Sequence, residues 1–485
     1  MDKHFDVLII GAGAVGCAVA RELSRCRLKT AVVEKECDVA AGTSGRNSAV
    51  VHAGFNNRPG TLMAKLCVEG SEHFEALCRE LDVPYHKTGK VLVAFDDKDM
   101  EILSGLVRQG EQNGCKGLRL IDGETLHRLV PQVGGIGAME SPNTAIFDPF
   151  LYTVALAENA LKNGVQFLMN QEVTAVRRET GGFAVSTPDR ELHCRMLINC
   201  AGLHSDQVAA LAGVAGYHLY PCRGEYLILD KIAQEYLRLP VYPAPRAGIG
   251  GLGVHLTPTI HGNVIIGPNA EYIDQREDCA TTKETLDELF RQAQILMPAL
   301  RRKDIIGAYS GIRSKLAPPN EGGFRDFIIQ EEPACPGLID LVGIESPGMT
   351  ASMPIARRVA DMVRAALSPE PNPDFDPRHQ GILRFAEQSP EVKAQLIAQD
   401  PDYGEIICRC QQITKKEIRQ AIENPLGARS IAAIKYRAWP TTGRCQGGYC
   451  LTRIVEMLEK EYGVCPEQIT QRGTGSELFS GKVKP

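Results

Sequence analysis

A strand-like apolar run followed by three spaced glycines opens this chain: Phe5-Asp-Val-Leu-Ile-Ile-Gly11-Ala-Gly13-Ala-Val-Gly16. The pattern predicts a strand over 5–10, a tight turn, a helix to about residue 26 and a second strand over 28–34. Glu34 closes that second strand, where a carboxylate can accept hydrogen bonds from ribose hydroxyls. Glycines in such a turn let a pyrophosphate approach the helix N-terminus. The stretch therefore predicts a dinucleotide-binding β-α-β unit.

Composition limits the kind of protein this can be. The 485 residues are 44% hydrophobic and 23% charged, as in globular proteins, and the length favours more than one domain. A formal net charge of −5 gives no reason to expect nucleic acid or an anionic membrane as a partner. No apolar run approaches the ~18 residues of a membrane-spanning helix, so we expect no direct span.

The cysteines bear on the compartment. Sixteen cysteines are spread along the chain and do not form a short disulfide framework, which favours the reducing cytoplasm. The apolar stretch 7–20 resembles the core of a signal peptide. Its regular glycines, and Glu22 and Arg25 just beyond it, argue against that interpretation.

A proline-rich segment divides the chain. Residues 368–377 read Ser-Pro-Glu-Pro-Asn-Pro-Asp-Phe-Asp-Pro, and prolines lack the N–H that helices and central strands need. Apolar periodicity before this segment predicts helices over 62–81, 149–163, 283–297 and 351–367. We therefore expect four parts, which are a large domain over 1–367, a linker over 368–404, a small module over 405–465 and a tail over 466–485.

Four cysteines stand out in the expected module. Cys408-Arg-Cys410 precedes Cys445-Gln-Gly-Gly-Tyr-Cys450 by 34 intervening residues. Structural zinc prefers wider C-x2–4-C spacings, and two disulfides would conflict with a reducing compartment. A [2Fe-2S] cluster accepts four thiolates in two close pairs, and we favour it over zinc. A capping box over 414–417 starts one helix after the first pair, and a second helix is expected over 451–462.

A second polar loop and a histidine carry a family resemblance. Gly42-Thr-Ser-Gly-Arg-Asn-Ser48 is followed by Ala49-Val-Val-His52-Ala-Gly54. This region resembles FAD enzymes of the D-amino-acid-oxidase-like superfamily, in the branch of L-2-hydroxyglutarate dehydrogenase and anaerobic glycerol-3-phosphate dehydrogenase. The resemblance continues through Ile198–Gly202, Arg223–Tyr226, Val254–Thr259, Ser310–Arg313 and Gly343–Thr350, and so covers nearly all of residues 1–367.

The resemblance implies an α/β fold with FAD as cofactor. It implies a two-lobed, Rossmann-type FAD-binding domain with an inserted α+β substrate domain, mainly over 215–325, and a small helical C-terminal [2Fe-2S] module. The residues expected to bind FAD come from the glycine turn, the polar loop, an adenine-side strand and two later turns. They are Gly11, Gly13, Gly16, Glu34, Thr43, Ser44, Arg46, Asn47, Ser48, Val173, Ala201, Gly202, Gly348, Met349 and Thr350.

Four residues are candidates for the substrate site. Flavin oxidation of an alcohol needs a base, and His255 is the candidate, although a packed histidine bonded to backbone is the alternative. Arg313 stands where the family holds its anionic substrate. His52 is expected near the flavin ring, in a tuning or a structural role. Arg223 could bind a second anionic group, but an ion pair with an acidic neighbour is favoured slightly. The glycine-rich stretch 247–253 is a candidate substrate loop.

The cysteine pattern is similar to the bacterioferritin-associated-ferredoxin-like module, with which anaerobic-type glycerol-3-phosphate dehydrogenases also end. That resemblance makes Cys408, Cys410, Cys445 and Cys450 the expected ligands of a [2Fe-2S] cluster. One stretch departs from the family: the residues before Gly443 are usually basic and Gly/Met-rich, whereas here they read Tyr436-Arg-Ala-Trp-Pro-Thr-Thr. The ligands are unaffected, but the docking surface or the potential is expected to differ.

Together these observations predict an FAD-dependent dehydrogenase. We expect it to oxidise a small anionic secondary alcohol, such as glycerol 3-phosphate or an L-2-hydroxy acid like 2-hydroxyglutarate. Electrons are expected to leave FAD through the cluster to a partner subunit, a quinone or a carrier. Two alternatives stay open, an amine or amino-acid dehydrogenase of the opine or glycine type on the same fold, and an electron-transfer subunit without catalysis of its own.

Overall fold

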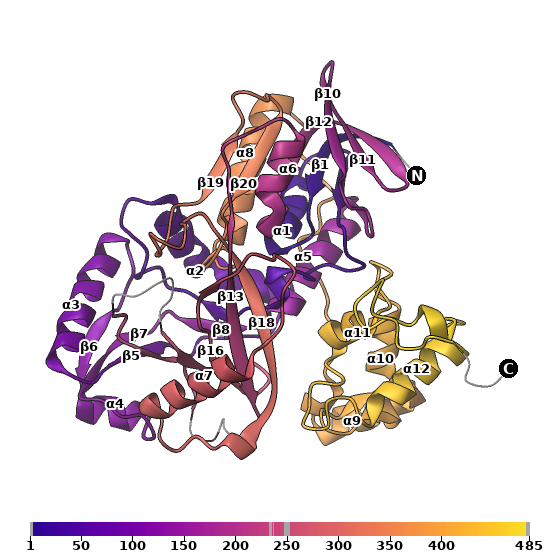
Figure 1. The fold of residues 1–485 in the computed structure, drawn as a ribbon. Coiled ribbons are helices and arrows are strands. Elements are labelled where there is room, and N and C mark those ends of the chain that lie inside the picture. Colours follow the sequence, from indigo (N-terminus) through magenta and orange to yellow (C-terminus); the bar gives the residue numbers. More distant parts are fainter. Residues whose placement is uncertain (1–2, 232–234, 236, 247–252, 482–485) are drawn as a thin grey trace.

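The computed structural model describes residues 3–231, 235, 237–246 and 253–481 (Figure 1). Two large sheets, one with parallel central strands and one mostly antiparallel, form two lobes, and a group of C-terminal helices lies beside them. Part of the candidate substrate loop, residues 247–252, lies outside the described residues.

The first sheet forms the nucleotide lobe, in the order β10-β11-β12-β1-β2-β9, with β20 paired to β12 and β19 to β20. Its central strands are parallel: β12 (Arg190–Asn199), β1 (His4–Ile10), β2 (Thr30–Val33) and β9 (Gln166–Leu168), with β20 (Leu338–Val342) beside β12. Strands β10 (Ala175–Glu179), β11 (Gly182–Thr187) and β19 (Ile328–Glu331) are antiparallel to their neighbours. The chain returns to this sheet after a long excursion, so the lobe is discontinuous, as predicted.

Four helices bury their apolar sides in one core against this sheet. They are α1 (Ala14–Leu23), α2 (Leu62–Glu80), α5 (Pro149–Lys162) and α8 (Ser352–Leu367). Helix α5 shows why the sequence starts a helix there, because Asp148 accepts hydrogen bonds from the N–H groups of Phe150 and Leu151 and Pro149 occupies the first helical position. The helices predicted over 62–81, 149–163, 283–297 and 351–367 are all present, and each of their ends lies within one residue of the predicted position.

The second sheet runs β17-β13-β16-β15-β14-β5-β7-β6, with β18 paired to β13. From the expected insertion come β13 (Tyr220–Leu229), β14 (Val241–Pro243), β15 (His255–Pro258), β16 (Val264–Gly267), β17 (Glu271–Tyr272) and β18 (Ile305–Lys315), with helix α7 (Lys283–Leu296). The substrate lobe was predicted mainly over 215–325, and its sheet also includes three strands from an earlier part of the chain. Strands β5 (Lys90–Ala94), β6 (Arg119–Asp122) and β7 (Gly137–Ser141), with helices α3 (Asp97–Gln112) and α4 (Gly123–Leu129), complete the same lobe.

Three short strands form a small third sheet. Strand β8 (Ala145–Phe147) pairs with β3 (Val50–Val51) and with β4 (Tyr85–His86). Helix α6 (Ser205–Leu211) follows β12 on the nucleotide lobe. Among the described residues, no helix is both long and apolar enough to cross a membrane.

The segment expected as a linker is pinned to the nucleotide lobe. The Asn159 side chain donates to the carbonyls of Asp376 and Arg378, and His379 Nε2 lies 3.0 Å from Glu158. Helix α9 (Pro390–Gln399) follows. These contacts make the segment an ordered strap across α5.

The C-terminal module has its own apolar core. It contains β21 (Ile406–Cys408), β22 (Ile413–Thr414), α10 (Lys415–Ile422), α11 (Ile431–Ala438) and α12 (Cys450–Lys460). The predicted capping box is present, since Thr414 and Glu417 hydrogen-bond each other's backbone. Figure 1 shows these yellow helices grouped beside the lobes, with α11 on the side of α5. The predicted fold class is confirmed, while the exact domain boundaries stay predictions.

Candidate active site

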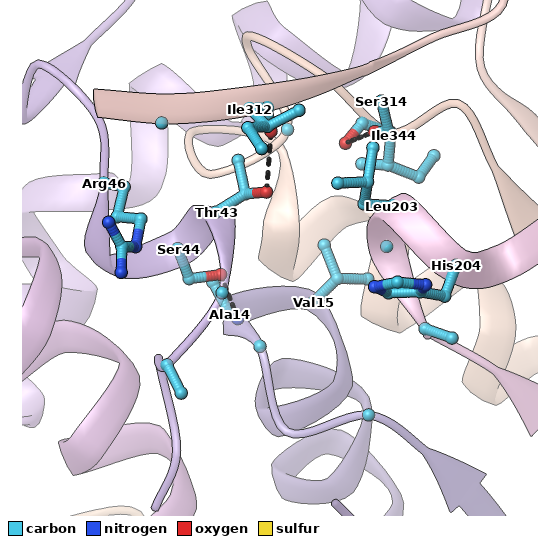
Figure 2. A pocket seen from close by; sticks show the side chains of 18 of the residues that line it. Ala14, Val15, Thr43, Ser44, Arg46, Leu203, His204, Ile312, Ser314 and Ile344 are labelled. Carbon is cyan, nitrogen blue, oxygen red and sulfur yellow. Dashed lines mark hydrogen bonds between the residues drawn. The ribbon is translucent and has the colours of Figure 1, made fainter. Parts of the chain in front are cut away.

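A cavity of about 890 Å³ runs between the two lobes. It is lined by the glycine turn, the polar loop, the ends of β12 and β18, and the turn before α8; Figure 2 shows part of this lining. Of the predicted FAD-binding residues, fourteen line it: Gly11, Gly13, Glu34, Thr43, Ser44, Arg46, Asn47, Ser48, Val173, Ala201, Gly202, Gly348, Met349 and Thr350. The volume suits a large cofactor together with a small substrate.

The glycine turn has the geometry that the fingerprint predicts. Gly11 has φ +102°, and a Cβ there would lie 2.6 Å from the carbonyl oxygen of Cys200. Gly16 does not line the cavity; a Cβ there would lie 2.0 Å from the Gly11 carbonyl oxygen, so this glycine allows close packing of α1 against the turn. The turn therefore leaves room for backbone to approach a phosphate, but only its first two glycines border the cavity.

Glu34 closes the cavity at the end of β2. Its carboxylate accepts from the backbone N–H of Ala12 at 2.6 Å and of Glu36 at 3.0 Å. Burial raises the pKa of this carboxyl group, and the two backbone donors counter part of the shift. The Glu34 carboxylate thus connects the glycine turn, through Ala12, to the loop that follows β2, through Glu36. This is the position where ribose hydroxyls are expected.

The polar loop is tied to the glycine turn and to β18. Ser44 Oγ accepts from the Ala14 N–H at 2.9 Å, and Thr43 Oγ1 donates to the Ile312 carbonyl at 2.9 Å, as Figure 2 shows. The Arg46 guanidinium donates to the Ser310 carbonyl at 3.3 Å. These contacts place the loop between the two lobes, where it can reach a cofactor that spans them.

His255 and His52 both line the cavity as neutral imidazoles. His255 Nδ1 lies 3.0 Å from the Gly253 carbonyl, and its buried Nε2 has no hydrogen-bond partner among the described residues. His52 Nε2 lies 3.5 Å from Ser346 Oγ. Burial is the main cause that lowers the pKa of each histidine to about 3. With its proton on Nδ1, His255 presents Nε2 as an acceptor, which is what a general base requires.

Arg313 lines the same cavity, and its guanidinium also hydrogen-bonds the Tyr226 side chain. One guanidinium nitrogen donates to the Asn269 carbonyl at 3.0 Å, and the other lies 3.6 Å from Cys222 Sγ. Within the described part of the chain, no carboxylate forms a salt bridge with it. A planar cation in a cleft suits a carboxylate or a phosphate.

Arg223 is placed differently from the prediction that it touches substrate. It does not line the cavity, and its guanidinium is held by Glu271 and Asp278, each at 2.8 Å. These two carboxylates pair with both terminal nitrogens, and Glu225 lies 3.6 Å from the Nε, so the acidic-neighbour alternative describes Arg223. We no longer assign Arg223 to the substrate site.

Lys90 is a buried charge that sequence reasoning missed. It begins β5 and is 2% exposed, with its ammonium 4.7 Å from the Phe55 ring centroid and 4.2 Å from that of Tyr242. The Tyr242 ring in turn stacks on His255 at 3.8 Å. Burial lowers the pKa of Lys90 to about 7, and the charge of Lys90 helps to lower the pKa values of both histidines. A lysine in a wholly apolar strand, Lys-Val-Leu-Val-Ala, was the available signal.

Replacing Lys90 with methionine is expected to stabilise the protein most below pH 7 and least near pH 10. The folded-state pKa of about 7 lies below the unfolded value, so the penalty for burying the charge is complete below pH 7 and vanishes as pH rises towards 10.5. The full penalty is roughly a few kcal/mol, reduced by the two ring contacts. Melting temperatures of both proteins from pH 6 to 10 measure it, with exposed Lys303→Met as control; a pH-independent gap would contradict the prediction.

The four module cysteines form two pairs. Cys410 Sγ lies 3.3 Å from Cys445 Sγ, and the buried Cys408 and Cys450 hydrogen-bond each other. That bond is the main cause that lowers the pKa of Cys408 to about 6, and the bond to Cys410 lowers the pKa of Cys445. Across the described residues, no three His, Cys, Asp or Glu side chains converge as a single metal ion would require. Two adjacent pairs suit two irons better than one zinc.

The cysteine end of the module faces the end of β13 and β18. Arg444 forms a salt bridge with Asp230 at 3.0 Å, and Lys231 donates to Gln411 at 2.8 Å. A Cβ at Gly307 on β18 would lie 3.8 Å from the side-chain oxygen of Gln446. Arg313 lies six residues after Gly307 on the same strand, and it lines the cavity. At the usual rise per residue of a strand, the two positions are roughly 20 Å apart. One strand therefore connects the cysteines to the cavity.

Two family models match the chain. Residues 6–362 match the FAD dependent oxidoreductase family, and residues 406–460 match the BFD-like [2Fe-2S] binding domain. Both parts of the predicted resemblance are confirmed, as are its two cofactors, FAD and a [2Fe-2S] cluster.

Individual relatives agree with these matches. A glycerol 3-phosphate dehydrogenase from Caloramator mitchellensis is 37% identical over 483 residues, which is 99% of each chain. A mitochondrial L-2-hydroxyglutarate dehydrogenase from Nematostella vectensis is 31% identical over 74% of this chain and 90% of its own. The structure of an L-alpha-glycerophosphate oxidase from Mycoplasma pneumoniae with FAD bound superposes with a TM-score of 0.73 at 28% identity, over 78% of this chain and 99% of the oxidase.

Proposed function

We propose that this chain, which belongs to the FAD dependent oxidoreductase family and carries a BFD-like [2Fe-2S] binding domain, is a dehydrogenase of glycerol 3-phosphate. The full-length likeness to a glycerol 3-phosphate dehydrogenase favours this substrate over the L-2-hydroxy acids of the shorter relatives. The four module cysteines are needed as thiolates, and the described cysteines form no disulfide; both points support a reducing cytoplasm as the compartment.

One observation carries the proposal: a neutral histidine and a largely unpaired arginine line the same cavity as the FAD fingerprint. An anionic alcohol needs a cation for its charged end and a base for its hydroxyl. Arg313 offers the first and His255 the second. An amino-acid substrate would also use the arginine, and its ammonium group would also have to lose a proton, so the likeness to a glycerol 3-phosphate dehydrogenase is what favours an alcohol.

The residues around the cavity fit FAD. Gly11 and Gly13 leave space at the N-terminus of α1 for a pyrophosphate, and Glu34 lies where the ribose is expected. FAD, when bound, supplies the acceptor for the hydride of the carbinol carbon. His255 Nε2 accepts the hydroxyl proton as the C–O bond becomes a carbonyl, so the alcohol loses two electrons and two hydrogens. Arg313 holds the phosphate, and the lobes exclude bulk water.

The electrons leave through the module. Cys408, Cys410, Cys445 and Cys450 would hold the cluster, which would supply one-electron transfer towards an acceptor outside this chain. The exposed pair Cys410 and Cys445 marks the side an acceptor subunit, a quinone or a carrier would approach. An oxidase that used oxygen directly would not need this exit.

A substrate panel tests the proposal. The anoxically purified protein is mixed with glycerol 3-phosphate, L-2-hydroxyglutarate, other 2-hydroxy acids and amino acids, and bleaching of the flavin absorbance is followed. We expect glycerol 3-phosphate to bleach the flavin fastest. Bleaching by amino acids alone would overturn the alcohol proposal in favour of an amino-acid dehydrogenase. Failure to turn over any substrate with an artificial acceptor would favour the non-catalytic subunit.

A further inference from the structure

The C-terminal module contributes to the wall of the FAD cavity. Ser430, Ala432, Ala433 and Tyr436, from α11 and its cap, line the cavity, as does Arg472 from the following segment. These residues belong to the [2Fe-2S] binding domain and the segment after it, whereas every other lining residue comes from the two lobes. We infer that the docked module completes the FAD-binding site, so that module docking and FAD binding stabilise each other.

The module's wall faces the loop over residues 34–46, here called the 34–46 loop. The residues of this loop that line the cavity include Glu34, Asp38, Gly42, Thr43, Ser44 and Arg46. Because Glu34 ends β2, where ribose is expected to bind, the wall lies on the adenosine diphosphate side of the cofactor. The substrate-side residues His255 and Arg313 come from the other lobe. The inference therefore concerns cofactor binding and does not depend on the identity of the substrate.

A buried ion pair fixes the module to this loop. Arg437 on α11 donates to both carboxylate oxygens of Asp38, at 2.6 and 3.0 Å, and to Glu158 on α5 at 3.2 Å. Arg437 is 3% exposed and Asp38 is 6% exposed. A bidentate, desolvated pair sets the orientation of both partners, and removal of one leaves the other buried and uncompensated. Docking of α11 therefore determines where the 34–46 loop lies.

Two further contacts hold the loop from the same side. Tyr436 stacks on Phe150 at 4.1 Å with an interplanar angle of 11°. A Cβ at Gly45 would lie 2.9 Å from the Phe150 ring, so this aromatic pair presses on the loop next to Thr43 and Ser44. At the other end, Cys37 Sγ donates to the Arg472 carbonyl at 3.2 Å. The loop is thus held between its own lobe and the module along most of its length.

The consequence follows from linkage. A ligand that binds better to the docked state stabilises docking, and docking raises the affinity for the ligand by the same factor. Bound FAD would contact the 34–46 loop, which lines the cavity, whereas an undocked module would leave that wall open to water and remove the module's contacts with the loop. Loss of docking should therefore weaken FAD binding without a change in the glycine turn itself.

The affinity test uses the full chain with its cluster. The flavin-free protein is titrated with FAD, and the dissociation constant is read from quenching of FAD fluorescence. We expect Arg437→Met and Tyr436→Ala each to raise this constant by about tenfold or more. Tyr436→Phe, which keeps the stacked ring, should match wild type. Arg419→Met should also match wild type, because this arginine pairs with Asp402 and Glu461, away from the 34–46 loop.

Tryptophan fluorescence can test the reverse effect, in which FAD binding stabilises module docking. Trp439 is the single tryptophan, and its indole donates to Asp148 at 2.9 Å and lies 3.7 Å from the His261 ring, both outside the module. Its emission should therefore shift to the red when the module undocks. Addition of FAD to the flavin-free wild type is expected to raise the temperature of this shift.

Two outcomes would overturn the inference. One is an unchanged FAD dissociation constant in variants whose Trp439 emission already reports a released module. The other is a wild-type undocking temperature that FAD does not move. Cluster absorbance checks that each variant is folded; if Arg437→Met lacks it, the Tyr436 pair and the wild-type experiment still decide. Neither result depends on the substrate panel, so this inference and the proposed function fail separately.

Discussion

Replacement of Arg313 by alanine is expected to lower kcat/KM for glycerol 3-phosphate by about 100- to 1,000-fold, because a partly buried cation that pairs with a substrate anion is worth several kcal/mol. Among the described residues, the guanidinium contacts the Asn269 carbonyl, the Cys222 thiol and the Tyr226 hydroxyl but no carboxylate, so its charge is available to a substrate anion. Most of the loss should appear in KM, since the arginine binds a group that does not react. Anaerobic flavin reduction at varied substrate concentration separates the two constants.

The neutral alcohol glycerol is the matched control for this prediction. It lacks the phosphate, so the Arg313→Ala variant should oxidise it as slowly as wild type does, and the preference for the phosphorylated substrate should disappear. Arg313→Lys should recover part of the affinity, because lysine keeps the charge without the bidentate fork. An equal loss with both substrates would show that Arg313 supports the fold and not the substrate.

Replacement of Cys410 or Cys445 by serine is expected to remove the cluster while leaving the flavin chemistry intact. Both cysteines are exposed, so these changes disturb the module core less than changes at the buried Cys408 or Cys450. Anaerobic reductive titration of wild type should take up about three electrons per chain, two in FAD and one in the cluster, against about two in the variants. Reduction of the flavin by substrate should stay within about twofold of wild type, because His255 and Arg313 are untouched.

The exposed Cys465 provides the control, because it lies in the same part of the chain but in neither cysteine pair. Cys465→Ser should keep the wild-type electron count and EPR signal. If the four cysteines bound zinc, wild type itself would contain zinc without iron and take up only two electrons. A cluster signal that survives in Cys410→Ser would contradict the assignment of its ligands.

Local sequence signals predicted the parts of the fold that local physics controls. The glycine turn and the capping box at Thr414 appear as expected, because backbone conformation and capping depend on residues a few positions apart. Helix ends agreed for the same reason. Fourteen of the fifteen residues predicted to bind FAD line one cavity, because motif spacing places them on neighbouring turns. Gly16 shows the limit, since its spacing alone could not separate cofactor contact from helix packing.

Other residues could not be assigned from their neighbours in the chain. Whether Arg223 meets substrate or carboxylate depends on Glu271 and Asp278, which a β-strand pairing and a loop bring to it. The sequence shows Lys90 only as a lysine in an apolar strand. The fold brings the aromatic rings next to its ammonium group, and one of these rings comes from β14. The contribution of β5, β6 and β7 to the sheet of the substrate lobe was not predicted, because these strands come from a distant segment of the chain.

The sequence by itself determined the two cofactors and the redox chemistry that they supply, because a phosphate-binding glycine turn and the cysteine pairs are each built from closely spaced residues. Tertiary structure alone decided how the two halves of the enzyme meet. Asp38 and Arg437 are 399 residues apart, and only the packing of α11 on α5 brings them into one buried pair beside the cavity. Such contacts depend on the burial of surfaces that no local pattern describes, which is why the module's place on the FAD cavity emerges only from the folded chain.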